Sequence, residues 1–401
     1  MRRVLILGGG TGGTLLANLL ARRPFDVTVL SASDAHLFQP SLLYAALAGA
    51  SPRLTRPERR LLSRRVRLVR DTAVRVDLRA KRVRTASGSV YESDALVVAT
   101  GARAAPAQIP GLSETAARFG NYHSDVAAAL RLRAALDAFR GGTIAVGQAS
   151  PICVCPPSPA EGVFLIDRLL RRRGLREKTR LVFFTPYPRP YPAAAIDALV
   201  APRLRALGVE VRTVFDVESV DPATGTIRSL EGDELRCDLP VIVPPFAGAA
   251  IEYEPADVLD EDRFLAADKA TLRLKGVDDA YAIGDAAALP TSKAGVGAHL
   301  QAKVVAAELT GKPAAFDGRT HCPFDLGDGT GVFVTSSYSA RAVPCRPRRL
   351  NLWMKKLMPR VYWLSLSGLL EPIFDAYFAL TAPQAAPAPP APAPPREPAA
   401  R

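Results

Sequence analysis

Five cysteines are spread along the 401 residues of the chain, and two of them stand close together. Cys153 and Cys155 lie in the segment ICVCPPSPAEG, directly after the short apolar stretch TIAVG. A cysteine thiolate is a nucleophile, and a disulfide is an electrophile towards other sulfur anions. Five cysteines are too few for a disulfide framework in a chain of this length. We therefore expect a reducing compartment with one or two special thiols.

A glycine-rich turn near the start of the chain predicts a dinucleotide site. Gly8-x-Gly10-x-x-Gly13 follows an expected strand and opens an expected helix. The glycines allow a tight turn and close approach of the backbone to a pyrophosphate, which then faces the helix N-terminus. The next strand, DVTVL, should end in an acidic residue that binds a ribose, but Ser31 stands there, followed by Ser33. A serine hydroxyl can bind a ribose, although more weakly.

The two cysteines occupy the place of a second glycine-rich turn. An expected strand from Thr143 leads to Gly147, but the second and third glycines are missing and Ser150-Pro151 intervenes. Proline lacks the backbone N–H on which a phosphate cradle depends. We therefore predict that a nicotinamide dinucleotide site is lost here. The alternative is a divergent turn that still binds nicotinamide, with incidental cysteines.

Strands and helices alternate along most of the chain, which indicates an α/β fold with two Rossmann-like, doubly wound sheets. We expect a discontinuous first domain at 1–135 and 255–315, a second at 136–254, and a C-terminal region at 316–380. The Pro/Ala-rich residues 381–401 are expected to be disordered. The formal charge of +13 is spread along the chain without a basic–aromatic array, so nucleic-acid binding is not expected.

Two further strand ends, Thr100-Gly101 and Gly284-Asp285, form a trio with the first glycine turn. This trio resembles the two-dinucleotide-binding flavoprotein superfamily, in which Asp285 would contact the ribityl-phosphate region of the flavin. The resemblance implies FAD as the cofactor. The residues expected to contact FAD are Gly8, Gly10, Thr11, Gly12, Gly13, Ser31, Ser33, Val74, Thr100, Gly101, Gly284, Asp285 and Lys293.

Three longer stretches narrow the resemblance. CPPSPAEG…RRRGLREK, AIGDAAALPTSKAGVGAHLQA and HCPFDLGDGTG look like sulfide:quinone oxidoreductases, across roughly residues 1–370. The resemblance implies a catalytic redox pair made by Cys155 and Cys322, bridged as a disulfide beside the flavin, with Glu161 nearby. Some members of this family carry a third cysteine near the position of His123, and this chain has none there.

Several of these residues also have simpler interpretations. We expect Cys153 to be a packed thiol rather than the redox partner. Glu161 is either a cap of the following helix, whose first turn favours acids, or a proton acceptor near the redox pair. Lys293 is either a surface lysine or, as the resemblance implies, a cation that stabilises the reduced flavin. No spacing of histidine and cysteine suggests a metal site.

The C-terminal segment RPRRLNLWMKKLMPRVYWLSLSGLLEPIF mixes basic residues, Lys355 among them, with Trp353, Tyr362 and Trp363. Basic amphipathic segments with interfacial aromatic residues lie in membrane surfaces. The alternative is a core-packed helix with a basic outer face. No apolar run reaches the ~18 residues of a membrane span, and the start of the chain lacks a signal-peptide cleavage site. We therefore expect a peripheral, monotopic protein on a bacterial cell membrane, without a cleavable signal peptide.

The sequence thus predicts FAD-dependent oxidation of sulfide to zero-valent sulfur or polysulfide, with reduction of a membrane quinone. The expected partners are sulfide, the quinone and the membrane surface, and a homo-oligomer is left open. One alternative is a type II NADH:quinone oxidoreductase, which requires nicotinamide at Gly147. Another is a redox-silent FAD-binding scaffold on a membrane, in which Cys155 and Cys322 would lie far apart.

Overall fold

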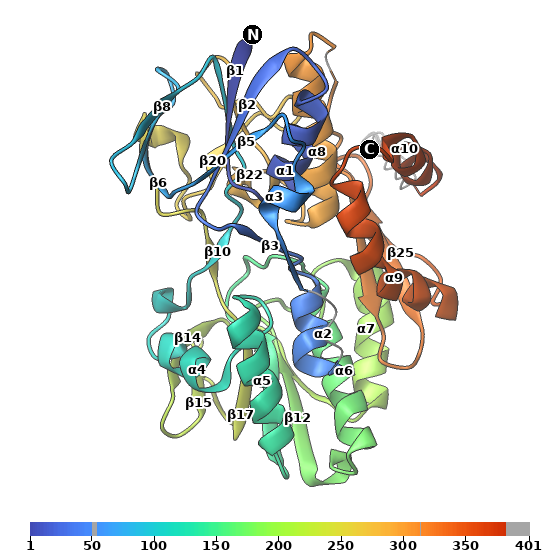
Figure 1. Cartoon of the computed structure of the whole chain (residues 1–401). Coiled ribbons are helices and arrows are strands. Elements are labelled where there is room, and N and C mark those ends of the chain that lie inside the picture. Colours follow the sequence, from blue (N-terminus) through green and yellow to red (C-terminus); the bar gives the residue numbers. More distant parts are fainter. Residues whose placement is uncertain (50–53, 313, 382–401) are drawn as a thin grey trace, which may run out of the picture.

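The computed structural model describes residues 1–49, 54–312 and 314–381. Two lobes lie one above the other, each built on its own parallel sheet, and the C-terminal elements lie along one side of both (Figure 1). The tail predicted to be disordered, 381–401, lies outside the described residues except for Thr381.

The first lobe is built on a five-stranded sheet in the order β21-β9-β1-β2-β5, in which every pair is parallel. The central strands β1 and β9 are continuous apolar runs that are buried on both faces, as parallel strands covered by helices must be. Helices α1 and α8 pack against each other beside this sheet. The elements are β1 (Arg2–Leu7), α1 (Thr11–Leu20), β2 (Phe25–Ser31), β5 (Arg67–Arg70), β9 (Ala95–Val98), β21 (Ala280–Ala282) and α8 (Gly295–Leu309).

The second lobe is built on a four-stranded parallel sheet in the order β13-β12-β11-β17. The chain runs from β11 through a loop of residues 149–157 into α6, which packs on β11 and β12. The α/β prediction with two Rossmann-type sheets is therefore confirmed. The elements are α4 (Leu112–Phe119), α5 (Val126–Ala138), β11 (Gly142–Gln148), α6 (Ser158–Arg172), β12 (Thr179–Phe184), α7 (Ala194–Ala206), β13 (Glu210–Arg212) and β17 (Leu239–Val243).

Smaller sheets and two short helices complete the two lobes. In the four-stranded sheet β19-β6-β7-β8, only β19 and β6 are parallel. The remaining elements are β3 (Ala35–Leu37), α2 (Ser41–Leu47), β4 (Thr55–Pro57), α3 (Glu58–Leu61), β6 (Ala73–Asp77), β7 (Arg82–Thr85), β8 (Val90–Glu92), β10 (Arg103–Ala104), β14 (Val217–Asp221), β15 (Thr226–Ser229), β16 (Glu234–Arg236), β18 (Phe246–Ala247), β19 (Glu252–Glu254), β20 (Leu265–Ala266) and β22 (Ala287–Ala288).

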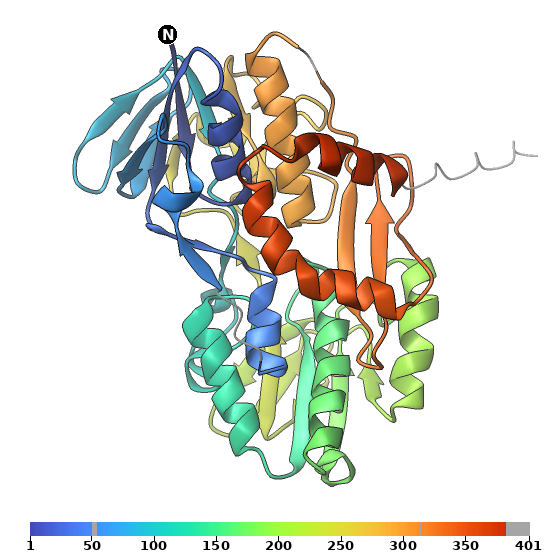
Figure 2. The ribbon, with the colours of Figure 1, turned by 45° about the vertical axis from the view of Figure 1, so that its right-hand side comes forward.

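The C-terminal region is a three-stranded antiparallel sheet followed by two helices. Its strands are β23 (Thr320–Asp325), β24 (Gly331–Ser336) and β25 (Val343–Pro344), and its helices are α9 (Arg349–Ser365) and α10 (Glu371–Leu380). Helix α9 crosses β23 and β24 and continues up beside α1, and α10 lies near α8 (Figure 2). Among the described residues, no helix is long and apolar enough to cross a membrane.

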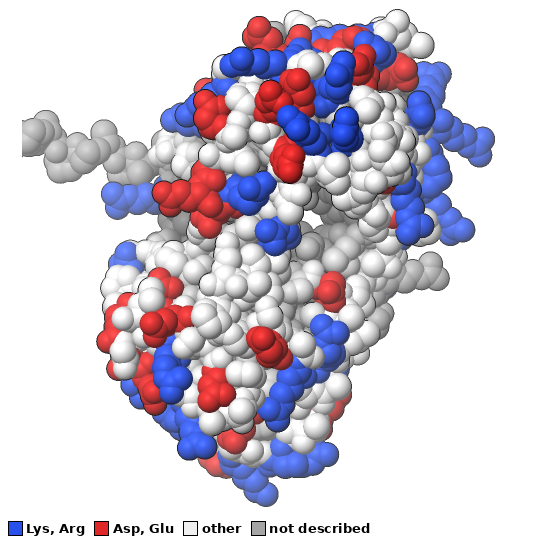
Figure 3. All heavy atoms as spheres, turned by 90° about the vertical axis from the view of Figure 1, so that its left-hand side faces the viewer, with Lys and Arg blue, Asp and Glu red and all other residues white. Residues whose placement is uncertain are grey.

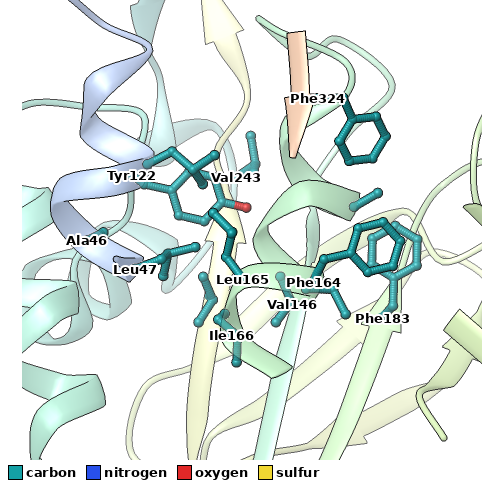
Figure 4. Packing of buried hydrophobic residues seen from close by; sticks show 14 of the residues in the cluster. Ala46, Leu47, Tyr122, Val146, Phe164, Leu165, Ile166, Phe183, Val243 and Phe324 are labelled. Atoms are coloured by element: carbon teal, nitrogen blue, oxygen red, sulfur yellow. The ribbon is translucent and has the colours of Figure 1, made fainter. Parts of the chain in front are cut away.

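One hydrophobic cluster joins the second lobe to the C-terminal sheet. Phe164 of α6 stacks on Phe324 of β23 with ring centroids 5.9 Å apart, and Phe183 of β12 lies beneath them (Figure 4). Cys322, on the same strand as Phe324, is buried in this cluster. The packing of α6 against β23 therefore fixes the position of one predicted redox thiol relative to the loop that carries the other.

The surface charges agree with the expectation that the excess of basic residues is spread over the molecule. In the view of Figure 3, basic and acidic side chains are interspersed over both lobes, and a mostly uncharged band crosses between them. On this face the net charge of +13 does not gather into one basic patch.

Candidate active site

The residues predicted to contact the dinucleotide meet at one edge of the first sheet. The turn at Gly8–Gly10 follows β1, Ser31 ends β2, Thr100-Gly101 follow β9, and Gly284-Asp285 follow β21. These strands are parallel and adjacent, so their carboxyl ends share an edge, where open α/β sheets bind ligands. Val74 lies on β6, in the separate sheet β19-β6-β7-β8, and near it Asp71 donates its N–H to the Ser31 carbonyl at 3.0 Å.

The first glycine turn fits a pyrophosphate for steric reasons. Gly8 has φ +106°, and a Cβ there would lie 2.4 Å from the Ala99 carbonyl oxygen. A Cβ on Gly13 would lie 2.0 Å from the Gly8 oxygen, so the helix can pack this closely only with glycine. A Cβ on Gly10 would meet nothing within 4 Å, which leaves open space in front of the turn at the start of α1.

Two polar side chains at this edge also bear on the fit to FAD. The Thr100 hydroxyl is buried and has no hydrogen-bond partner among the described residues, so a ligand group would satisfy it. Burial raises the pKa of Asp285, with Lys293 opposing the shift. The Ser31 hydroxyl, in contrast, donates to the Ser33 carbonyl at 2.8 Å and is used locally. The glycine turn, the unpartnered Thr100 hydroxyl and the buried Asp285 carboxyl therefore fit an FAD molecule bound at this edge.

Lys293 connects this edge to the thiol loop. Its ammonium group donates to the carbonyl oxygens of Asp285, at 2.7 Å, and Ala287, at 3.1 Å, and lies 3.6 Å from the centroid of the Phe264 ring. Burial lowers the pKa of Lys293, and Asp285 opposes the shift. It is thus a largely enclosed cation rather than a surface lysine. Its carbonyl accepts the N–H of Cys155 at 3.1 Å.

Cys155 is held in an unusual backbone conformation. Its φ is +66°, in the left-handed region that non-glycine residues seldom occupy, at a cost of about 1–3 kcal/mol. Two hydrogen bonds stabilise it there: its N–H donates to Lys293, and its carbonyl accepts the N–H of Ser158 at 2.9 Å. The thiol is therefore fixed between the FAD edge and the first turn of α6.

Cys322 reaches the same place from the C-terminal sheet. Burial raises the pKa of the Cys155 thiol well above its usual value, and Cys322 is the largest electrostatic contributor. The two thiols therefore lie close enough to influence each other electrostatically, which argues against the scaffold alternative, in which they lie far apart. The expected Cys155–Cys322 disulfide is not formed in this structure, since all five cysteines are free.

A buried ion pair, which the sequence analysis missed, lies next to the backbone of β23 beside Cys322. The Lys355 ammonium of α9 pairs with the Glu161 carboxylate of α6 and donates to the Pro323 carbonyl at 3.0 Å. Glu161 also accepts the N–H of Asp325 at 3.2 Å. Burial raises the pKa of Glu161, and Lys355 opposes the shift. Glu161 is thus not a simple helix cap, because its side chain turns inward to the C-terminal region.

The structure corrects the membrane assignment of part of the C-terminal segment. Lys355 points inward to Glu161 rather than outward to lipid. Trp363 is only 6% exposed and packs with Phe38 and Leu366. The Tyr362 hydroxyl hydrogen-bonds Thr11 at 2.8 Å, at the start of α1. An amphipathic sequence pattern does not tell which face of a helix meets protein and which meets solvent, and here these residues occupy the protein face.

The Tyr362 hydroxyl also joins a second buried cluster that had no sequence signal. His36 hydrogen-bonds both Tyr362 and the Glu58 carboxylate, the latter at 2.8 Å, and Thr14 donates to Glu58 at 2.6 Å. His36 and Glu58 are fully buried. The cluster attaches α9 to α1 near the glycine turn, so the C-terminal helix contacts both the FAD lobe and, through Lys355, Glu161 of α6.

The pKa of Cys322 gives a first test of the site. Burial raises it to about 11, Lys355 opposes the shift, and Glu161 and Asp285 add to it. The thiolate is the form that reacts with alkylating agents, so alkylation of Cys322 in the reduced holoprotein should accelerate roughly tenfold per pH unit from about pH 7 to 10. Peptide mass spectrometry measures the rate, and a Cys322→Ser variant assigns it. A plateau below about pH 9 would contradict the placement of this thiol.

Residues 2–308 match the pyridine nucleotide-disulphide oxidoreductase family. The chain is similar to the mitochondrial sulfide:quinone oxidoreductase of Mus musculus, with 24% identity over 386 residues, covering 90% of this chain and 85% of that protein. It is also 26% identical to the type II NADH:quinone oxidoreductase Ndh of Mycobacterium tuberculosis, over 85% of this chain and 79% of that protein. The solved structure of the sulfide:quinone oxidoreductase from Aquifex aeolicus superposes with a TM-score of 0.83 at 18% identity, covering 95% and 96% of the two chains.

These comparisons agree with the geometry of the first lobe. The family match spans the glycine turn, both further strand ends and the second Rossmann-type sheet. The predicted resemblance to sulfide:quinone oxidoreductases is confirmed, and so is FAD as the cofactor. The chain therefore belongs to the pyridine nucleotide-disulphide oxidoreductase family and is an FAD-dependent oxidoreductase similar to sulfide:quinone oxidoreductases.

Proposed function

We propose that the chain oxidises sulfide to zero-valent sulfur and passes the electrons through FAD to a membrane quinone. The proposal rests on the backbone hydrogen bond that ties Cys155 to Lys293 at the FAD edge, together with the electrostatic influence of Cys322 on Cys155, although the two cysteines come from motifs in different parts of the chain. The pairing of Glu161 with Lys355 beside Cys322 supports it.

The sulfur chemistry follows from the two thiols. Hydrosulfide attacks one sulfur of a Cys155–Cys322 disulfide, the S–S bond breaks, and one cysteine becomes a persulfide while the other becomes a thiolate. Transfer of the outer sulfur to a small thiol or a second hydrosulfide leaves both cysteines as thiols. Closing the disulfide again releases two electrons and two protons. FAD, when bound, accepts electron pairs from thiols and delivers them to quinones.

The surrounding side chains have separate tasks in this scheme. Glu161, whose pKa burial raises, is placed to hold a proton that the thiols release. Lys355 stabilises the Cys322 thiolate, because its charge lowers the pKa of that thiol. Lys293 places a buried cation at the FAD edge, where it would stabilise negative charge on the reduced cofactor. The backbone hydrogen bond from the Cys155 N–H to the Lys293 carbonyl holds the loop that carries Cys155 next to the segment that carries this cation.

The turn after β11, where a second dinucleotide would bind, is not suited to NADH. A Cβ on Gly147 would lie 2.3 Å from the Phe184 carbonyl oxygen, so this glycine serves strand packing rather than a phosphate. The loop 149–157 then replaces a short glycine turn. An open cavity of about 430 Å³ beside it is lined by Ser150, Pro151, Asp216 and Asp262 among others. The two carboxylates there would repel a pyrophosphate.

The electron donor distinguishes this function from NADH oxidation. When sulfide is mixed with the anaerobic holoprotein, the absorbance of oxidised FAD should disappear as the cofactor is reduced. NADH should hardly change this absorbance, because the chain has a reaction site for sulfide but none for a nicotinamide dinucleotide. Stopped-flow spectroscopy with each donor measures this. Rapid bleaching by micromolar NADH, with none by sulfide, would show that the chain is a type II NADH oxidoreductase instead.

The proposed site of membrane contact is the outer face of α9 and α10. Six large apolar side chains are exposed along these helices and the turn between them, and five of them are at least 59% exposed. They are Leu350, Trp353, Leu364, Leu369, Ile373 and Leu380. Such a row is unfavourable in water and fits the interfacial region of a bilayer, where a quinone is found.

Substitution on this outer face should release the protein from lipid. Burial of one large apolar side chain contributes about 1.5–3 kcal/mol, so Trp353→Ala with Ile373→Ser should weaken liposome binding by about 100-fold or more. Flotation with anionic liposomes measures the affinity, and circular dichroism checks the fold. The matched control is Val214→Ser, an exposed apolar residue of the second lobe. Unchanged flotation of the double variant would contradict this assignment.

A further inference from the structure

The polar cluster that attaches α9 to α1 is a continuous chain of hydrogen bonds that ends at the glycine turn. Thr11, the first residue of α1, shares a hydrogen bond of 2.8 Å with the Tyr362 hydroxyl. Tyr362 also bonds His36 Nε2, and His36 Nδ1 lies 2.8 Å from a Glu58 carboxylate oxygen. Side chains from α1, α9, β3 and α3 therefore join a buried acid to the turn that fits a pyrophosphate.

The buried acid lies against the glycine turn itself. A Cβ on Gly9 would meet the Glu58 carboxyl carbon at 3.0 Å, and the side chains of Glu58 and His36 are each 1% exposed. Among the described residues, His36 is the basic side chain that pairs with Glu58. When His36 is neutral and Glu58 is ionised, the pair carries a negative charge that repels a pyrophosphate bound at the turn. One added proton makes the pair neutral and removes this repulsion.

The direction of the hydrogen bonds depends on the same proton. A carboxylate only accepts, so a neutral His36 donates from Nδ1 to Glu58 and accepts at Nε2. Tyr362 must then donate to His36, and Thr11 must donate to Tyr362, so every proton points away from the glycine turn. One added proton, on His36 or on Glu58, makes Nε2 a donor and reverses both hydroxyl bonds. The Thr11 O–H can then donate to a ligand, in the open space in front of Gly10.

The other groups around the pair allow this reversal. Burial raises the pKa of Tyr362, so its hydroxyl keeps its proton and can donate in either direction. Thr14 donates to Glu58 at 2.6 Å and is not part of the path to the turn. The charged group facing the pair from β4 is Arg56, the cross-strand partner of His36, whose guanidinium lies over the Trp363 ring at 4.8 Å. The proton therefore has its place between His36 and Glu58.

We infer that this chain is a proton-linked positioning device for the FAD pyrophosphate. Binding of FAD is accompanied by uptake of one proton from solvent into the His36–Glu58 pair, and the Thr11 hydroxyl turns to donate to a phosphate oxygen. Thr11 is the residue at the ligand, and Tyr362 and His36 are positioning residues that act through it. Helix α9 thereby becomes part of the FAD site. The inference requires FAD but neither sulfide nor a quinone, so it stands apart from the proposed function.

The chain can be broken without moving α9, because other contacts hold this helix beside α1 (Figure 2). Asn18 donates to the Leu366 carbonyl at 2.7 Å, and Arg22 donates to the Gly368 carbonyl at 2.9 Å. The Tyr362 ring packs on Phe38 with centroids 4.3 Å apart. Tyr362→Phe keeps this packing and removes only the hydroxyl, so the variant should fold.

The first experiment counts protons. FAD is titrated into the apoprotein by calorimetry, in buffers of different ionisation enthalpy, which gives the number of protons taken up on binding. Uptake by the wild type should approach about one proton per FAD between about pH 5 and 8, and the FAD affinity should fall as the pH rises, by up to about tenfold per pH unit. Glu58→Gln has no charge behind the turn, so its binding should take up hardly any proton. Equal uptake by both proteins, or none by the wild type at any of these pH values, would overturn the inference.

The second experiment observes the phosphate end of the chain. A phosphorus NMR resonance of the bound FAD should move with pH in the wild type and in Thr11→Ser, which keeps the hydroxyl. It should stay fixed in Thr11→Val and in Tyr362→Phe, and FAD affinity there should fall about three- to tenfold, the effect of one lost hydrogen bond. The matched control is Tyr377→Phe, which removes a hydroxyl bonded to His321 at 2.6 Å and should change nothing at the turn. A resonance that still moves with pH in Thr11→Val would overturn the inference, whereas failure of sulfide to reduce the wild-type FAD would contradict only the proposed function.

Discussion

Cys155→Ser and Cys322→Ser should each abolish sulfide-dependent quinone reduction, by on the order of 10⁴-fold, while FAD stays bound. Each substitution removes an obligatory bond-forming step, so the double variant should be no slower than either single one. The residues of the glycine cradle and the FAD edge are untouched by these changes, so the bound FAD spectrum should persist. Quinone reduction measured spectrophotometrically, with the FAD content of each preparation, tests both parts.

The other cysteines provide the controls for this result. Cys237 is buried among apolar side chains of the second lobe, and Cys345 is exposed on the C-terminal region, so serine at either position should be nearly silent. If Cys153→Ser were the inactive variant and Cys155→Ser were tolerated, the redox thiol would lie on the other side of Val154 from the one proposed.

Lys355→Met should destabilise the protein by about 3–5 kcal/mol, because it leaves the Glu161 carboxylate buried without its partner charge. The folded state then favours the protonated acid, since burial raises the pKa of Glu161. The loss of stability should therefore be largest at neutral pH and shrink as the pH falls and Glu161 binds a proton. Denaturant midpoints at several pH values measure this dependence.

A double variant separates two causes of the lost stability: an unpaired buried charge and lost side-chain packing. Lys355→Met combined with Glu161→Leu removes both partners, and such replacements are close to neutral or stabilising. It should regain most of the lost stability but not the sulfide activity, because Cys322 would lose the ammonium that lowers its pKa. A double variant as unstable as the single one would show that Lys355 acts through packing rather than charge.

The first lobe could be predicted from the sequence because its signals are local. In the turn at Gly8–Gly13, the contact that requires glycine at position 13 is with Gly8, five residues earlier, and the turn's glycine spacing is readable directly from the sequence. Thr100 and Asp285 follow apolar strands, and parallel strands bring such ends to one edge. The positions of Cys155 and Cys322 came from a resemblance, and no local pattern would have paired them.

The remaining parts of the site could not be predicted, because they depend on tertiary contacts alone. Lys355 and Glu161 lie far apart in the sequence, and nothing in an amphipathic helix marks which lysine turns inward. Trp353 and Trp363 look equivalent in the sequence, yet the first is 59% exposed and the second 6%.

The placement of β21 in the first sheet has a consequence for how the protein is made. This strand pairs with β9, although almost two hundred residues separate them in the chain, and its turn carries Asp285. At ~5–20 residues per second of synthesis, β1 waits roughly 15–55 s on the ribosome before the last strand of its sheet is translated. A complete FAD site cannot exist during that interval, and α9, which contacts both α1 beside the glycine turn and Glu161 of α6, emerges later still. Cofactor capture is therefore a late event in the life of the nascent chain, and the half-finished first sheet is the part most exposed to chaperones and proteases.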